Sequence, residues 1–169
     1  MDTKHTVIES PLGRLTAVAE GDRLTGLHFE DRENEAPEAP EAVFGPRVDT
    51  DFRETRRQLD EYFAGERTRF DLPLTFHGDD FDKRVWNLIA GIGYGETRSY
   101  GRLAEQLGNP GLARAVGAAT GRNPVVVVVP CHRVLGADGS LTGFGGGLDR
   151  KRYLLRLEEP PAEEAGRLF

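Results

Sequence analysis

The sequence has one cysteine, one methionine, one tryptophan and no long apolar run among its 169 residues. A single cysteine, Cys131, has no partner for an internal disulfide, which excludes a disulfide-stapled secreted domain. The longest apolar run is the five valines at 125–129, far short of the roughly 20 residues that cross a membrane as a helix. The first ten residues also lack the apolar core of a secretory signal. We therefore expect a cytoplasmic protein with a reduced thiol.

Charge is unevenly distributed along the chain. The formal net charge is -6, but residues 1–79 carry 10 Lys and Arg against 18 Asp and Glu, whereas residues 80–157 carry 11 against 6. Binding to phosphates depends on the local field rather than on the total charge. The basic second half is therefore compatible with a nucleic-acid-binding face. The alternative is a solvated surface of mixed charges.

The first half of the chain has the pattern of a small sheet followed by a helix. Residues 7–9, 14–20 and 23–30 are short, partly alternating stretches separated by the turn sequences SPLG and EGDR, which predicts an antiparallel meander. Residues 31–46 are rich in Glu, Pro and Ala without an apolar period, which predicts a mobile acidic loop. Apolar spacing over 51–65 predicts a helix. We place a domain boundary after the following linker, giving domains of 1–78 and 79–169.

Capping residues organise the second half. Asp80 or Asp82 is the expected N-cap of one helix. A last helix is expected to begin at Asp149, to be anchored by Tyr153, Leu154 and Leu157, and to end at Glu158.

Between these two helices, the segment SYGRLAEQLGNPGLARAVG predicts a close pair of short helices. Ser99 caps the first, Gly108 ends it, and Asn109 with Pro110 opens the second. The pattern fits a helix-turn-helix whose second helix exposes Arg114. An ordinary helical hairpin would need similar residues and is the alternative.

The segment PCHRV, residues 130–134, carries the chemistry. It follows the valine run, so we expect an extended segment that is forced into a turn at Cys131. The neighbouring His132 and Arg133 predict a nucleophilic thiol whose pKa is lowered, because cationic and imidazole groups favour the thiolate. A buried structural thiol is the alternative.

A histidine base needs a geometry that a flat strand does not offer. Neighbouring side chains point to opposite faces of a strand, so proton transfer from Cys131 to His132 requires a turn or a bridging water. A catalytic imidazole is usually held by a carboxylate on its other nitrogen. Glu158 is one of many candidates for that carboxylate by spacing.

PCHRV resembles the active-site signature of the O6-alkylguanine-DNA alkyltransferases, also called methylated-DNA–protein-cysteine methyltransferases. It stands in register with SYGRLAEQLGNP, ARAVG, NP, GFGGGL and RKRYLLRLE, and the resemblance covers residues 81–158 closely. The N-terminal part is similar only loosely. The resemblance implies an α+β protein in which a small ribonuclease-H-like N-terminal domain precedes a winged-helix or helix-turn-helix domain that binds DNA and carries the catalytic residues.

The resemblance also implies an activity, which is DNA repair by direct reversal. An alkyl group would pass from O6-alkylguanine, or alternatively from O4-alkylthymine, to Cys131 in a single irreversible turnover. His132 would act as base through a water, and Glu158 would hold His132. Tyr100 would assist the leaving guanine, and Arg114 would fill the stack after the base flips out. The remaining implied positions are Ala113 and Gly117 on the DNA-binding surface and Asn123, Val134, Phe144, Gly145 and Gly146 in the substrate pocket.

The implied partner is duplex DNA containing alkylated guanine, bound by a monomer without a cofactor. Phe144 and Gly145 depart from the tyrosine and serine of animal members, so backbone amides would replace the lost hydroxyls. No metal site is expected, because the one cysteine is already assigned and the histidines at positions 5, 28 and 77 lack close partners. These histidines are expected at the surface or in turns.

Three other functions are compatible with parts of the sequence. A binder of alkylated lesions would keep the fold but lack the acceptor, and Cys131 argues against it. A Cys-His hydrolase would leave the motifs around Tyr100 and Arg114 unexplained. A winged-helix transcription factor of this kind would need a further cysteine-rich regulatory domain, which this sequence does not contain.

Overall fold

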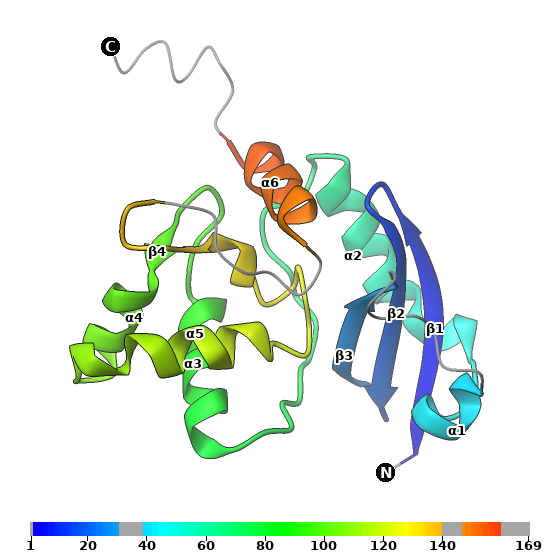
Figure 1. Cartoon of the computed structure of the whole chain (residues 1–169). Coiled ribbons are helices and arrows are strands. Elements are labelled where there is room, and N and C mark those ends of the chain that lie inside the picture. Colours follow the sequence, from blue (N-terminus) through cyan, green and yellow to red (C-terminus); the bar gives the residue numbers. More distant parts are fainter. Residues whose placement is uncertain (1, 31–38, 140–146, 160–169) are drawn as a thin grey trace.

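The computed structural model describes residues 2–30, 39–139 and 147–159, which form a sheet-containing N-terminal half and a helical C-terminal half (Figure 1). The sheet has the order β1-β2-β3, with β1 at Thr3–Ser10, β2 at Gly13–Glu20 and β3 at Arg23–Phe29. The central strand β2 pairs antiparallel with both β1 and β3, and two-residue turns join consecutive strands. The predicted meander is therefore confirmed.

The rest of the N-terminal half is helical. The segment predicted as a loop over 31–46 contains a short helix, α1 (Pro40–Phe44), so that expectation is wrong for these five residues. A proline at the first helical position, with its φ already near the helical value, accounts for the start of α1. The predicted helix over 51–65 is present as a 3-10 turn, η1 (Asp49–Phe52), which continues into α2 (Arg53–Phe63).

The free edge of β3 is closed by two segments from later in the chain. Leu24 exchanges backbone hydrogen bonds with residues 73–75, and Leu27 does so with residues 124–126, at distances of 2.8–3.1 Å. Both pairings are parallel bridges. The linker and the beginning of the valine run thus satisfy backbone groups that an exposed edge strand would present to solvent.

The C-terminal half begins with α3 (Asp80–Ala90), whose N-cap is Asp79 rather than Asp80 or Asp82. The Asp79 carboxylate accepts from the Asp82 N–H at 2.7 Å. The elements that follow are β4 (Arg98–Ser99), α4 (Tyr100–Gln106), η2 (Pro110–Leu112), α5 (Ala113–Gly121), η3 (Cys131–Arg133), β5 (Val134–Leu135) and α6 (Leu148–Leu157). None of the helices in the described ranges has the length and apolar composition that a membrane crossing requires.

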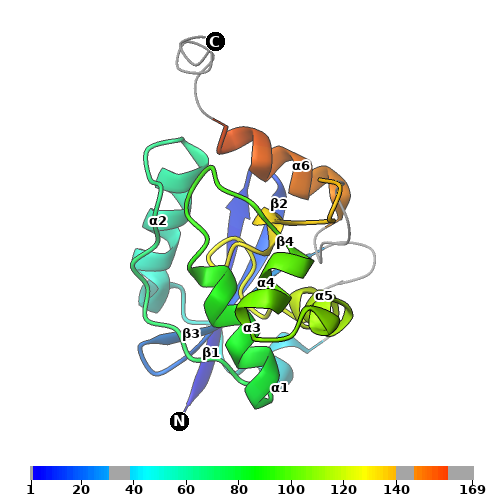
Figure 2. The same cartoon turned by 90° about the vertical axis from the view of Figure 1, so that its left-hand side faces the viewer.

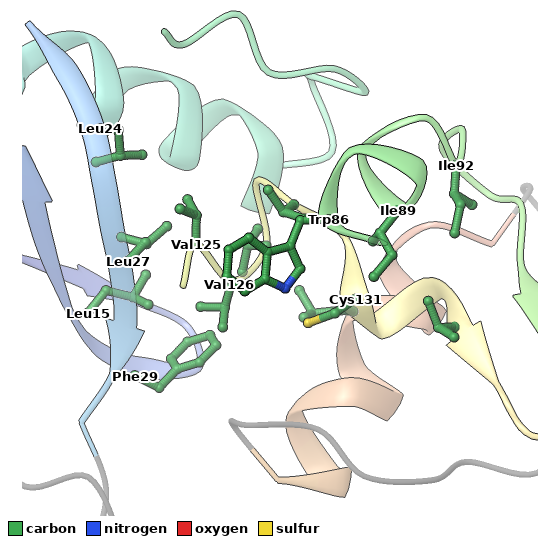
Figure 3. Packing of buried hydrophobic residues seen from close by; sticks show 14 of the residues in the cluster. Leu15, Leu24, Leu27, Phe29, Trp86, Ile89, Ile92, Val125, Val126 and Cys131 are labelled. Atoms are coloured by element: carbon green, nitrogen blue, oxygen red, sulfur yellow. The ribbon is translucent and has the colours of Figure 1, made fainter. Parts of the chain in front are cut away.

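One hydrophobic core runs through both halves. Figure 3 shows Leu27 of β3 on one side, Val125 and Val126 between the halves, and Trp86 and Ile89 of α3 beyond them. The Trp86 indole N–H donates to the carbonyl of Ala119 at 2.8 Å, which fixes α3 against α5. The halves are therefore joined by packing as well as by the chain.

Helix α6 lies close to elements of both halves (Figures 1 and 2). Near its start, the Arg150 guanidinium stacks over the Phe29 ring, 4.5 Å from the centroid, and its Nε donates to the Leu12 carbonyl at 2.9 Å. Of the three residues expected to anchor this helix, Leu154 is fully buried and Leu157 packs against the core, whereas Tyr153 is 39% exposed. The expectation is therefore confirmed for the two leucines and wrong for Tyr153.

Candidate active site

The valine run is tightly folded rather than extended. The Val128 N–H donates to the Val126 carbonyl at 2.8 Å across Val127, whose φ is 71°. This combination is a γ-turn with a positive φ at its centre, a conformation that is rare and strained for a β-branched residue. The expectation of an extended segment before Cys131 is therefore wrong.

Asn123 stabilises this folded segment from its side chain. The Asn123 amide nitrogen donates to the Val129 carbonyl at 2.8 Å, and its amide oxygen accepts from the Val125 N–H at 3.0 Å. The Cys131 N–H in turn donates to the Val129 carbonyl at 2.8 Å. Both ends of one buried amide thus shape the loop that positions the thiol.

Cys131 lies at the first position of η3 and is 3% exposed. Burial raises the pKa of Cys131 to about 11, although a hydrogen bond with Asn123 and the charge of Lys151 act in the opposite direction. The expectation of a lowered pKa is therefore wrong. At neutral pH the resting residue is a thiol, so a base has to remove its proton during any reaction.

The predicted pairing of His132 with Glu158 is present in the structure. His132 is fully buried, and its Nε2 donates to Glu158 Oε2 at 2.7 Å. Glu158 is the C-cap of α6, so the last turn of that helix carries the carboxylate to the thiol segment. The turn of η3 supplies the departure from strand geometry that proton transfer between neighbouring residues needs.

Arg133 is the counter-ion of Glu158. Its Nε donates to Oε1 at 2.7 Å and its Nη2 donates to Oε2 at 2.9 Å, while Nη1 donates to the Ile92 carbonyl at 2.6 Å. Arg133 is 6% exposed. Burial alone would raise the pKa of Glu158, but the hydrogen bonds from His132 and Arg133 outweigh burial and hold the pKa at about 2. The carboxylate is therefore ionised.

His132 remains neutral beside this ion pair. Burial lowers the pKa of His132, and the favourable contact with Glu158 does not offset it. The positive charges of Arg133 and Lys151 act in the same direction as burial. A neutral imidazole next to a buried thiol is a group that can accept a proton.

Two residues near the site were not expected from the sequence. Lys151 of α6 is fully buried and donates to the Val134 carbonyl at 2.7 Å, and it is the cation whose charge acts on Cys131. Tyr62 of α2 donates to Glu158 Oε2 at 2.5 Å. Helical spacing places Lys151 on the same face as Leu154, which was a usable signal. In the sequence, Tyr62 is one of the apolar residues whose spacing predicts the helix over 51–65, and that spacing does not indicate a role for its hydroxyl.

The predicted DNA-binding residues lie together on the helix pair α4 and α5. Ser99 caps α4 as expected, and Gly108 ends it with a φ of 94°. The Tyr100 ring packs close to Gly117. A Cβ atom added at Gly117 would lie 3.8 Å from the ring, which is ordinary van der Waals contact. Arg114 is exposed and Ala113 is partly buried near the start of α5. The structure therefore brings together Tyr100 and Gly117 and leaves Arg114 accessible.

The basic charge of the second half is only partly available to a ligand. Arg133 and Lys151 are buried, Arg122 is paired with Asp82 at 2.6 Å, and Arg150 packs on the sheet. The charge count by sequence therefore overstates the exposed charge.

The structure describes some, but not all, of the other residues that were considered for the substrate pocket or for a metal site. Val134 is fully buried at the start of β5, whereas Phe144, Gly145 and Gly146 lie outside the described residues. His5, expected at the surface or in a turn, is buried in β1 and donates to the Gly45 carbonyl at 2.9 Å. Within the described ranges, no three His, Cys, Asp or Glu side chains gather around a point that could hold an ion.

Both halves match known families. Residues 3–76 match the family described as 6-O-methylguanine DNA methyltransferase, ribonuclease-like domain, and residues 80–160 match the one described as 6-O-methylguanine DNA methyltransferase, DNA binding domain. A relative from Mycolicibacterium paratuberculosis, named methylated-DNA–protein-cysteine methyltransferase, is 48% identical over 166 residues, or 98% of each chain. One of the same name from Methanosarcina acetivorans is 44% identical over 91% of this chain and 97% of its own.

Solved structures agree with these matches. The crystal structure of Mycobacterium tuberculosis O6-methylguanine methyltransferase has a TM-score of 0.84 and 46% identity, and it covers 98% of this chain and 99% of its own. The crystal structure of Mycobacterium tuberculosis OGT in complex with DNA has a TM-score of 0.81 and 47% identity, over 92% of each chain. The similarity thus includes the N-terminal half, beyond the loose likeness expected there.

Proposed function

The chain belongs to the 6-O-methylguanine DNA methyltransferase family, and from this membership we propose that Cys131 is the residue that accepts the alkyl group. The protein repairs DNA by direct reversal, through alkyl transfer from methylated DNA to a cysteine. The observation that supports Cys131 is its place on η3, directly before His132, whose imidazole is held by Glu158 at 2.7 Å.

The proposed step is a displacement at carbon. The S–H bond of Cys131 breaks, a bond forms between sulfur and the alkyl carbon, and the bond from that carbon to guanine O6 breaks. The thiol proton passes through a water to His132. The departing guanine anion takes up one proton from Tyr100, which regains a proton from solvent, and His132 releases its proton to solvent, so that a thiol and an alkylated base become a thioether and free guanine with no net change of charge. Sulfur is a soft nucleophile that suits attack on an sp3 carbon. The thioether product has no easy hydrolysis route, so each molecule reacts once.

DNA binding is assigned to the helix pair. We propose that Arg114 occupies the place of the flipped base and that Tyr100 assists the leaving guanine, with Ala113 and Gly117 facing the DNA backbone. Extrusion of a base costs a few kcal/mol, and a planar guanidinium can offset part of this cost by stacking. The exposure of Arg114 and the contact of Tyr100 with Gly117 support these roles.

The substrate pocket is assigned to Asn123, Val134 and the segment of Phe144, Gly145 and Gly146. Asn123 contributes by shaping the loop before Cys131. O6-alkylguanine is the proposed substrate, with O4-alkylthymine as an alternative.

We also propose a domain boundary near residue 78, a monomeric state on DNA and a cytoplasmic location. The location follows from the chemistry, because a thiol that accepts an alkyl group has to be kept reduced.

The experiment incubates the protein with duplex DNA containing O6-methylguanine and measures its intact mass. We expect one added methyl group, on the peptide that contains Cys131. Cys131→Ala is the control, which we expect to lose transfer and to keep an affinity for DNA that falls steeply with salt. Repair of more than one lesion per protein molecule would contradict the proposal.

A further inference from the structure

A residue of the ribonuclease-like half reaches the proposed proton relay. Tyr62, in the last turn of α2, is fully buried, and its hydroxyl donates to Glu158 Oε2 at 2.5 Å across 96 residues of sequence. We propose that Tyr62 is a positioning residue for alkyl transfer, which orients the carboxylate that His132 depends on. This inference rests on the proposed roles of Cys131 and His132.

The geometry at Glu158 Oε2 supports a role beyond packing. This one oxygen accepts from Tyr62 at 2.5 Å, from His132 at 2.7 Å and from Arg133 at 2.9 Å, whereas Oε1 accepts from Arg133 at 2.7 Å. The donors come from two separate parts of the chain, Tyr62 from α2 and the neighbours His132 and Arg133 from η3. Because Arg133 donates hydrogen bonds to both oxygens, it sets the plane of the carboxylate. Tyr62 further restrains Oε2, the oxygen that accepts from His132.

The hydrogen bonds also determine which imidazole nitrogen is basic. An ionised carboxylate can only accept hydrogen bonds, so the nitrogen that faces it, Nε2 of His132, has to carry a hydrogen. The neutral imidazole then has its lone pair on Nδ1, which is the nitrogen that takes a proton. Donation from Tyr62 favours the ionised form of Glu158 and therefore this tautomer.

Tyr62 keeps its own proton throughout. Burial and the negative charge of Glu158 raise the pKa of Tyr62. The hydroxyl therefore stays protonated, and able to donate a hydrogen bond, at every pH used in the test below. The other charged or titratable groups that face this pair are Arg133 of η3, Lys151 of α6, Tyr94 after α3, and Cys131.

The test compares Tyr62→Phe with Tyr94→Phe, in the full chain. Each change removes one phenolic oxygen next to the same cluster. The Tyr94 hydroxyl donates to the Leu157 carbonyl at 3.1 Å and makes no hydrogen bond to Glu158, so it is a matched control. Second-order rates of methyl transfer from duplex DNA are measured as a function of pH, at a temperature at which circular dichroism shows all three proteins folded.

We expect Tyr62→Phe to slow transfer about tenfold, a small part of the 10²–10⁴ that a positioned base contributes, with unchanged affinity for DNA. Losing the donor makes Glu158 a stronger base and a stronger partner for a protonated His132, so the pKa of both groups rises. The acidic limb of the rate profile should then move to higher pH. Tyr94→Phe should keep the rate and the limb of the wild type.

A Tyr62→Phe variant with the wild-type rate and an unmoved acidic limb would overturn the inference, and so would equal effects of the two substitutions. The ¹⁵N shifts of the His132 ring give a second readout, since loss of the Nε2–H tautomer is visible without turnover. Failure of the proposed function is a separate result, because the wild type itself would then carry no methyl group on Cys131.

Discussion

The ionisable side chains around Cys131 are almost completely buried. Glu158 is 2% exposed, and His132 and Lys151 are fully buried. An ion this deep is stable only when its partners stay in place, because removal of one partner leaves the other desolvated. Single substitutions here should therefore change stability as well as reactivity, and the two effects have to be measured separately.

Glu158→Gln tests the ion pair with Arg133. We expect the free energy of unfolding to fall by about 3–5 kcal/mol, since the guanidinium loses its buried counter-ion. The pKa of Glu158 is lowered from 4.5 to about 2 in the folded protein, so its stabilisation is present above about 4.5 and is lost as pH falls toward 2. Urea unfolding at several pH values should show the gap to wild type closing over that window.

Glu159→Gln is the control for this change, because Glu159 is the exposed neighbour. A similar loss of stability in both variants would contradict the assigned ion pair.

The pH dependence of transfer tests His132 as the base. With a thiol pKa of about 11, attack by a preformed thiolate would accelerate about tenfold per pH unit through the neutral range. Removal of the proton by neutral His132 instead predicts a flat rate above the lowered pKa of the imidazole. We expect a flat profile between about pH 7 and 9 for the wild type, and a rising one for His132→Gln. A rising wild-type profile would refute the base assignment.

The helix pair depends on its capping residues and its turn. Ser99 accepts from the Arg102 N–H at 3.0 Å at the start of α4, and Asn109 accepts from the Gly111 N–H at 2.8 Å before α5. Gly108 between them adopts a positive φ that side chains rarely tolerate. These local interactions, together with Trp86 on the Ala119 carbonyl, place Arg114 on an exposed helix start.

Arg114→Ala should separate DNA distortion from chemistry. We expect transfer from duplex DNA to fall by a factor of about 10–100, the worth of one stacking contact. Transfer from the free alkylated base should be nearly unchanged, because no base has to be extruded. Arg53→Ala removes an equal, exposed charge from α2 and should leave both rates alone. Equal losses on both substrates would indicate that Arg114 acts in folding.

The two halves behave as one packing unit in the whole molecule. The sheet edge at β3 is completed by residues 73–75 and 124–126, and Arg150 and Tyr62 connect α6 to the N-terminal half. Because one core runs across the junction, neither half can open without exposing apolar surface of the other. Unfolding should therefore be a single transition.

Leu27→Ala tests this coupling, because Trp86 is the only tryptophan and reports on the other half. A buried leucine truncation should lower the midpoint of unfolding by about 6 to 15 °C. Trp86 fluorescence and the circular dichroism of the whole chain should shift together. Val43→Ala, at a position 60% exposed on α1, is the control. A Trp86 transition that stays at the wild-type midpoint would mean that the halves unfold independently.

Signals between near neighbours in the sequence were enough to predict most of the secondary structure. The meander, α2 and the capped helix pair follow from turn residues, caps and periodicity, which act over a few neighbours along the chain. The pairing of His132 with Glu158 was also predicted, but from the family resemblance of PCHRV and RKRYLLRLE rather than from spacing alone. The family resemblance rested on such short strings.

The position and environment of the thiol segment depend on contacts between residues that are far apart in the sequence. Asn123 folds the valine run into a strained turn, burial raises rather than lowers the pKa of Cys131, and Lys151 and Tyr62 arrive from distant elements. Desolvation and hydrogen bonds across 96 residues depend on which surfaces meet in the folded chain. These contacts cannot be predicted from residues that are close in sequence, because the same valines would fit an ordinary strand and the same tyrosine an ordinary helix.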